Sequence, residues 1–352
     1  MQSIIIGKNQ AGQRLDKFLH KYLPLAGTGF LYKMLRKKNI TLNGKKAEGN
    51  EILAIQDEIC VYFSRETFAR FTGGMQVTTA VGKGDVNMQL HPSRIKEYET
   101  AYLRLKGISV LYEDEDCLIL NKPAGILTQK ATASDLSLNE WLIGYLLSQN
   151  TAFEKELSTF RPSVCNRLDR NTSGILLCGK SLGGLQVLSR CIKERSIRKF
   201  YRTICVGALK APMTIEGYLV KDRAGNRVTL SDTPERVSQG GKASYVRTVC
   251  SPVLVTEEYT LLEVELITGK SHQIRAHLAS IGHPLIGDFK YGQEKVNHSL
   301  KEEVGLEHQL LHACSVIFPE ISAGSGSLLS GKTICAPCPE LFTRLEEKLF
   351  GR

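Results

Sequence analysis

Apolar side chains near the start of the chain follow a helical spacing. They recur every three or four residues over 14–23, which predicts a helix that ends at Pro24. The same spacing over 31–37 predicts a second helix, with Lys33 and Arg36 on its outer face. The first segment is therefore expected to form two short helices with basic surfaces.

A strand pattern follows these helices. Residues 40–42 are predicted to form a strand that meets an Asn43-Gly44 turn and returns, and 59–63 are predicted to form another. We therefore expect a small domain of mixed helix and strand over residues 1–63.

The next segment, residues 64–107, has weak periodicity and few large apolar side chains. It contains Gly73-Gly74, Gly82, Gly84 and His91-Pro92. This composition is typical of a linker or an insertion.

Strands dominate the remainder, residues 108–352, which we expect to be a second domain of the α+β class. The predicted strands are 110–112, 117–120, 175–177, 201–206 and 261–267. A helix is predicted to start at the capping pair Ser137 and Glu140, and another to cover about 182–192.

Composition and charge narrow the class of protein. The 352 residues are 42% hydrophobic and 23% charged, which excludes collagen-like, disordered and disulfide-scaffold proteins. Of the net charge of +10, the first 46 residues carry +9, because ten basic residues there face only Asp16. A polyanion is the expected partner of this segment. The candidate nucleic-acid contacts in it are Arg14, Lys17, Lys21, Lys33, Arg36, Lys37 and Lys38.

Membrane, metal and nucleotide sites are not predicted. No stretch approaches the roughly 18 apolar residues of a spanning helix, and the ten scattered cysteines are typical of buried thiols in a reducing compartment such as the cytoplasm. His272 and His277 are five residues apart, whereas the helical zinc motif needs a spacing of four. Cys335 and Cys338 form a single C-x-x-C pair beside prolines, and Gly269-Lys270-Ser271 lacks the second glycine of a phosphate-binding loop.

Two segments are dense in charge at the edge of apolar runs. Asp169 lies between Arg167 and Arg170 and just before the predicted strand 175–177, so the arginines should keep its carboxylate ionised. Arg275 lies beside apolar residues and is suited to pairing with a carboxylate or a phosphate. Taken singly, Asp169 is better explained as a structural residue that caps a turn or pairs with Arg167 than as a catalytic one, and Arg275 is at least as well explained as a surface helix charge. A third segment, 190–202, is rich in Arg and Lys with aromatic residues between them, as in a nucleic-acid contact.

Three segments in fixed order resemble the RluA-type pseudouridine synthases, the ribosomal large subunit group. They are N-R-L-D-R-N-T-S-G at 166–174, K-F-Y with a later V-G at 199–207, and T-G-K-S-H-Q-I-R-A-H-L-A-S-I-G-H-P-L-I-G-D at 268–288. N-K-P-A-G at 121–125 also matches the family. The two basic helices and the hairpin that follows them, which precede all these motifs in the chain, resemble an S4 RNA-binding domain.

The resemblance implies a catalytic domain built on a central antiparallel sheet, which isomerises uridine to pseudouridine in RNA without metal or other cofactor. It assigns Asp169 as the essential aspartate, Tyr201 as the tyrosine that contacts the target base, and Arg275 as the partner of the aspartate. Arg167 would occupy the gap left by a flipped base. The family usually has His where this chain has Asn166.

The expected partner is therefore RNA, most simply large-subunit ribosomal RNA, and the protein is expected to act as a cytoplasmic monomer with no nucleotide cofactor. Two alternatives stay open at this point: a transfer-RNA pseudouridine synthase, and a noncatalytic RNA-binding factor in ribosome assembly. A glycosidase with paired carboxylates would need a second acid that no motif supplies.

Overall fold

The N-terminal unit is a four-stranded sheet with two helices. The computed structural model describes residues 2–72, 77–79, 86–88, 92–158, 160–221, 228–231, 233 and 243–351. The elements of this unit are β1 (Gln2–Ile5), α1 (Leu15–Tyr22), α2 (Thr28–Arg36), β2 (Ile40–Leu42), β3 (Lys45–Lys46) and β4 (Glu58–Val61). The strands lie in the order β1-β4-β2-β3.

The predicted helices and hairpin of this unit are confirmed. Leu15, Phe18 and Leu19 are fully buried, as the helical spacing requires, and α1 ends before Pro24. Asn43 and Gly44 have φ of 52° and 70°, which gives the β2–β3 hairpin the left-handed turn that Asn-Gly favours. The unit has its own core. That it is an S4 domain remains a prediction.

The segment expected to be a linker contains secondary structure. Its elements are α3 (Arg65–Thr72), β5 (Val77–Thr79), β6 (Val86–Met88) and α4 (Pro92–Arg104). Helix α4 packs on α5 (Leu138–Gln149) of the second domain, where a Cβ atom at Gly144 would lie 2.2 Å from the Tyr98 carbonyl oxygen. The glycines at 73, 74, 82 and 84 and His91 lie outside the described residues.

The second domain is built on one large sheet. Its strands are β7 (Ser109–Glu113), β8 (Cys117–Lys122), β9 (Ser163–Val164), β10 (Ser173–Gly179), β11 (Arg198–Val206), β12 (Met213–Lys221), β13 (Val228–Ser231), β14 (Ser244–Val255), β15 (Tyr259–Leu266), β16 (Leu311–Ile317) and β17 (Thr333–Cys335). The order is β13-β12-β14-β15-β11-β16-β10-β8-β7, with β17 beside β16 and β9 beside β10. The described strand pairs are antiparallel except β10–β16, so the expected antiparallel sheet is mixed at its centre.

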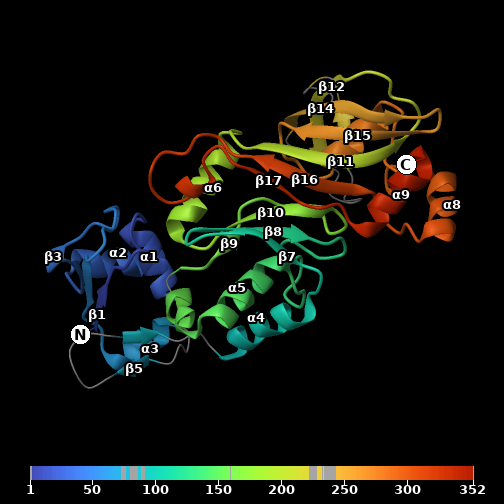
Figure 1. Cartoon of the computed structure of the whole chain (residues 1–352). Helices are drawn as coiled ribbons and strands as arrows, with labels where there is room; N and C mark the ends of the chain where they lie inside the picture. The colour runs from blue at the N-terminus through green and yellow to red at the C-terminus, as the bar shows by residue number, and fades with distance from the viewer. Residues whose placement is uncertain are drawn as a thin grey trace.

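Helices cover the sheet on both faces (Figure 1). They are α5 (Leu138–Gln149), α6 (Leu182–Lys193), α7 (Gln273–Ser280), α8 (Glu294–Val304) and α9 (Glu340–Phe350), with 3₁₀ turns at Thr151–Ser158 and Ser327–Leu329. Leu118 and Leu120 of β8 share a core with α5, whereas Cys117 and Ile119 share one with α6. Burial on both faces explains why this strand is a continuous apolar run. The predicted α+β class is confirmed.

Gly174 determines how the central strands meet. Its φ is 110°, and a Cβ atom there would lie 2.2 Å from the Ala313 carbonyl oxygen on β16. Only glycine fits this contact. The parallel β10–β16 pair therefore starts directly after the charged segment around Asp169, and it anchors that segment to the middle of the sheet.

Candidate active site

A cleft of about 600 Å³ lies among the chain segments that flank the central strands. Its lining consists of residues 127–129, 167–172, Tyr201, Leu266, 269–275, Gln309 and Leu311. This volume is that of a typical small-molecule site. The cleft therefore brings together the two charged segments and the tyrosine that the sequence analysis selected.

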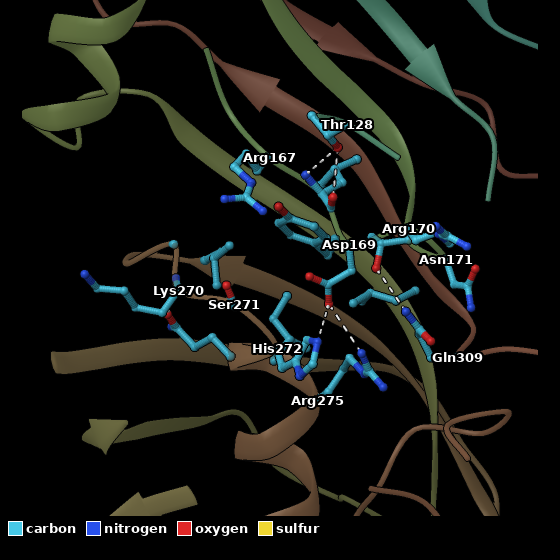
Figure 2. Close-up of a pocket in the computed structure, with 18 of the residues that line it drawn as sticks. Thr128, Arg167, Asp169, Arg170, Asn171, Lys270, Ser271, His272, Arg275 and Gln309 are labelled. Carbon is cyan, nitrogen blue, oxygen red and sulfur yellow. Dashed lines mark hydrogen bonds and ion pairs between the residues drawn. The ribbon is translucent and has the colours of Figure 1, made fainter. Parts of the chain in front are cut away.

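Asp169 projects into this cleft from the loop between β9 and β10. Its Oδ2 atom lies 3.4 Å from Nη1 of Arg275 and 3.8 Å from Nε2 of His272. Figure 2 shows both contacts on one carboxylate oxygen, with the other oxygen turned away from them. The side chain is 28% exposed. Asp169 thus combines a fixed cationic neighbour with access to a bound molecule.

Arg275 is held in turn by Asp288. The Nε–Oδ2 and Nη2–Oδ1 distances are 2.6 and 2.8 Å, and the Asp288 side chain is fully buried. Burial opposes ionisation of Asp288, but hydrogen bonds and charge from Arg275 outweigh it, and the pKa of Asp288 is lowered. This pair occupies two guanidinium nitrogens, and the third, Nη1, faces Asp169.

Tyr201 lies on β11 at an irregularity in the strand. The register with β16 shifts between Phe200 and Tyr201, and such bulges redirect side chains. The ring is 6% exposed and lines the cleft. Burial raises the pKa of Tyr201, and the Asp169 charge raises it further. The hydroxyl therefore keeps its proton at neutral pH and is available as a hydrogen-bond donor.

The backbone around Asp169 is fixed by two buried side chains that the sequence analysis did not select. Lys122 Nζ donates to the carbonyl oxygens of Pro123, Ile126 and Arg170 at 2.9, 3.0 and 2.9 Å. Thr128 Oγ1 donates to the carbonyl oxygen of Leu168 at 2.8 Å and accepts from its N–H at 3.2 Å. The residues on either side of Asp169 are thus anchored.

Lys122 could have been recognised from one signal. It is a lysine at the end of an apolar run, and such a residue needs buried acceptors. Burial lowers the pKa of Lys122 to about 7, against the opposing charge of Asp169. Thr128 gave no such signal, because threonine is ordinary in a loop.

Cations surround the mouth of the cleft. Arg167 and Arg170 are exposed on the Asp169 loop, and Lys270 is exposed on the loop before α7 (Figure 2). In the sequence, Lys270 is notable only within Gly269-Lys270-Ser271, which lacks the second glycine of a phosphate-binding loop. The positive mouth suits a phosphodiester backbone.

The N-terminal candidates do not line the cleft. Arg14 forms two hydrogen bonds with Asp16, at 3.1 and 2.9 Å, and Lys21 donates to Gln13 at 2.9 Å. Lys17 is exposed on α1, and four further cations are exposed at the end of α2 and just beyond it: Lys33, Arg36, Lys37 and Lys38. The N-terminal unit and the cleft are therefore separate surfaces.

The basic segment 190–202 does not form one continuous charged strip. Arg198 pairs with Glu265 at 2.7 and 3.1 Å, and Lys199 is buried. Asn166 does not line the cleft either. Its amide accepts from Leu177 N–H at 2.8 Å and donates to the Ile175 carbonyl oxygen at 3.3 Å, so it supports β10.

Among the described residues, no three or more His, Cys, Asp or Glu side chains are grouped so that they could hold a metal ion. None of the helices in the same ranges is long and apolar enough to cross a membrane.

Comparisons with known proteins indicate the class of enzyme. Residues 116–280 match a family model described as RNA pseudouridylate synthase. Over these residues the chain is similar to RNA pseudouridine synthases. The expected enzyme class, an isomerase, is thereby confirmed. Asp169, Tyr201 and Arg275 lie inside the matched range, whereas Asp288 and the N-terminal unit lie outside it.

Relatives of the synthase cover nearly its whole length. Ribosomal large subunit pseudouridine synthase C of Escherichia coli is 28% identical over 360 residues, covering 98% of this chain and 96% of that protein. An uncharacterized RNA pseudouridine synthase of Mycoplasma genitalium is 26% identical over 331 residues, covering 94% and 93%. Among solved structures, human RNA pseudouridylate synthase domain containing 4 has a TM-score of 0.56 at 19% identity, covering 72% of this chain and 97% of that one. The last comparison supports the fold.

Proposed function

We propose that this synthase converts specific uridines of large-subunit ribosomal RNA to pseudouridine, with Asp169 as the reacting carboxylate. The observation that carries the proposal is the placement of Asp169. One oxygen is held between Arg275 and His272 while the side chain stays open to the cleft. The names of the full-length relatives support ribosomal RNA as the substrate.

The reaction rearranges bonds within one nucleotide. The C1′–N1 bond breaks, the uracil turns while it stays bound, and C1′ joins C5. The C5 proton then leaves and N1 takes up a proton, so the product is an isomer of the substrate. An ionised carboxylate can attack C1′ or C6, or remove a ribose proton to give a glycal. Each route needs a carboxylate whose orientation is fixed, and the Arg275–Asp288 pair supplies that here.

The other residues take roles around the uridine. Tyr201, protonated and buried, packs against the base and can donate a hydrogen bond to it. A uridine in a duplex must leave the helix to reach Asp169, at a cost of a few kcal/mol. Arg167, exposed at the mouth, fills the space that the base leaves. Phosphate contacts by the N-terminal unit offset this cost.

Tritium release tests the proposal directly. Large-subunit ribosomal RNA labelled at uridine C5 is incubated with wild type and with Asp169→Asn. The variant should release no tritium, while its affinity for the RNA stays within a few fold, because the substitution removes only the charge. Glu294→Gln on α8, whose side chain is 87% exposed, is the matched control and should release tritium as wild type does.

Each alternative has its own outcome in this experiment. Release that survives Asp169→Asn contradicts the role of Asp169. If the wild type binds the RNA tightly but releases no tritium, the result favours a noncatalytic assembly factor. Release from transfer RNA but not from ribosomal RNA would move the substrate to transfer RNA.

A further inference from the structure

His272 is the second group that contacts Asp169, and it has an unusual backbone. Its φ and ψ are 56° and 14°, in the left-handed region that few residues other than glycine adopt. Such conformations persist where the surrounding structure enforces them, and they concentrate at functional sites. The side chain is 13% exposed and its Nε2 atom lies 3.8 Å from Oδ2 of Asp169.

Gln273 enforces this conformation of the loop. Its Oε1 accepts from Lys270 N–H and Thr268 Oγ1 at 3.1 and 2.9 Å. Its Nε2 donates to the Arg247 carbonyl oxygen and Thr248 Oγ1 at 3.0 and 2.9 Å. The side chain is 2% exposed. Gln273 thus makes two hydrogen bonds within the loop around His272 and two to β14.

Tyr291 is the hydrogen-bond partner of the second imidazole nitrogen, Nδ1. Its hydroxyl oxygen accepts from the Val228 N–H at 2.9 Å and can also donate its phenolic proton. Nδ1 of His272 lies 3.0 Å from that oxygen and can accept this proton. A neutral imidazole that accepts at Nδ1 carries its hydrogen on Nε2. That hydrogen faces Asp169.

The imidazole is neutral at physiological pH. Four charged groups face it: Asp169, Asp288, Arg275 and Lys290. Burial lowers the pKa of His272, and the two cations add to this effect against the two carboxylates. His272 therefore approaches Asp169 as a neutral donor.

The geometry points to His272 as a positioning residue that, with its hydrogen on Nε2, holds Oδ2 of Asp169 together with Arg275 and presents Oδ1 to the nucleotide. This inference rests on the proposed function. The 3.8 Å contact is longer than a hydrogen bond, and such contacts often tighten when substrate fills the site.

The tautomer is tested without RNA. Ring nitrogen shifts of protein labelled with ¹⁵N-histidine distinguish a hydrogen on Nε2 from one on Nδ1, and His272→Asn assigns the signal among the eight histidines. We expect the Nε2–H form in wild type and a mixture in Tyr291→Phe, which keeps the aromatic ring but lacks the hydroxyl. An Nδ1–H form in wild type would overturn the inference.

Single-turnover kinetics on a large-subunit ribosomal RNA transcript test the positioning role. His272→Asn should lower the single-turnover rate constant by about 10- to 100-fold with little change in RNA affinity, because the asparagine amide is too short to reach Asp169. Asn tolerates the left-handed backbone, so backbone strain cannot explain that loss. His272→Gln, whose longer amide can donate at the position of Nε2, should restore most of the rate. His298→Asn, exposed on α8, is the matched control and should match wild type.

The pH profile separates positioning from a structural role. A cationic His272 would bind Asp169 more strongly and lower its reactivity, so the wild-type rate should fall as pH drops through the His272 pKa, which lies below 6.5. His272→Gln should lack this fall. A wild-type rate and profile in His272→Asn would reject the inference and leave the proposed function intact. Failure of wild type to form pseudouridine would reject the proposed function, while the tautomer would still be decided.

Discussion

At the scale of single residues, the site depends on a line of ion pairs that runs from the core to the cleft. Asp288 is fully buried, Arg275 is 8% exposed, and Asp169 is 28% exposed. The buried pair fixes the guanidinium, and the guanidinium contacts the carboxylate that we propose as the reacting group. Asp288, which does not line the cleft, is therefore expected to control the orientation of Asp169, which does.

Asp288→Asn tests this dependence. The variant leaves Arg275 without its anionic partner in the core, so we expect kcat to fall by about 100-fold and the free energy of unfolding by about 3 kcal/mol. Single-turnover rates and urea unfolding measure the two effects. Glu265→Gln, which breaks the more exposed two-point pair with Arg198, is the matched control and should change stability by less than about 1 kcal/mol. A wild-type rate in Asp288→Asn would show that Arg275 needs no such partner.

At the scale of elements, α7 carries Arg275, which contacts Asp169, and two residues later the buried His277. His277 is fully buried, its Nδ1 lies 2.8 Å from Thr248 Oγ1, and its buried Nε2 has no hydrogen-bond partner within the described ranges. The same threonine receives a hydrogen bond from Gln273. The packing of α7 on β14 therefore requires a neutral imidazole at this position.

This requirement predicts a loss of stability in mild acid. Burial lowers the pKa of His277 to about 4, against 6.5 when unfolded. Between these values the unfolded chain binds a proton that the folded chain does not, so stability falls as pH drops. Urea unfolding should show a loss of about 2 kcal/mol from pH 7 to pH 5 that His277→Gln lacks. Equal losses in the two proteins would mean that His277 is not responsible.

At the scale of the whole molecule, the exposed cations of the N-terminal unit and the cleft form two separate surfaces. The N-terminal unit lies at one end and α8 and α9 at the other (Figure 1). Lys8 of the N-terminal unit pairs with Glu115 at 3.4 Å, and Asn9 contacts Glu156, so the unit contacts the catalytic domain. Its exposed cations lie outside the cleft, which suits them to binding RNA away from the reacting nucleotide.

The salt dependence of RNA binding tests this division. Replacing Lys33, Arg36, Lys37 and Lys38 with Ala should reduce the slope of log affinity against log salt by about 3, if each cation contacts one phosphate. The single-turnover rate at saturating protein should stay near that of wild type. Replacing Lys295, Lys301 and Arg344, exposed on α8 and α9, is the control and should leave the slope unchanged. An unchanged slope in the first variant would mean that these four residues do not contact RNA.

The sequence by itself determined the elements that local rules control and the residues that sit in dense motifs. The helical spacing predicted α1, the Asn-Gly turn predicted the first hairpin, and the order of the motifs selected Asp169, Tyr201 and Arg275 as site residues. Helix α4 was missed because its apolar stripe is narrow, with Tyr98 and Ala101 as its buried residues. Gly144 of α5 lets the α4 backbone approach closely, so a narrow apolar stripe is enough to pack the two helices together. The pattern of α4 alone does not reveal this contact.

Only the tertiary structure decided which polar groups hold those residues in place. Lys122, Thr128 and Asp288 act through hydrogen bonds to segments distant in the sequence or across a turn, and no spacing rule indicates such partners. His272 contacts Tyr291, and the Tyr291 hydroxyl accepts from the backbone of β13; these groups meet only when the chain folds. Local propensity determines which elements form. The orientation of a reactive group depends on contacts that exist only after those elements pack.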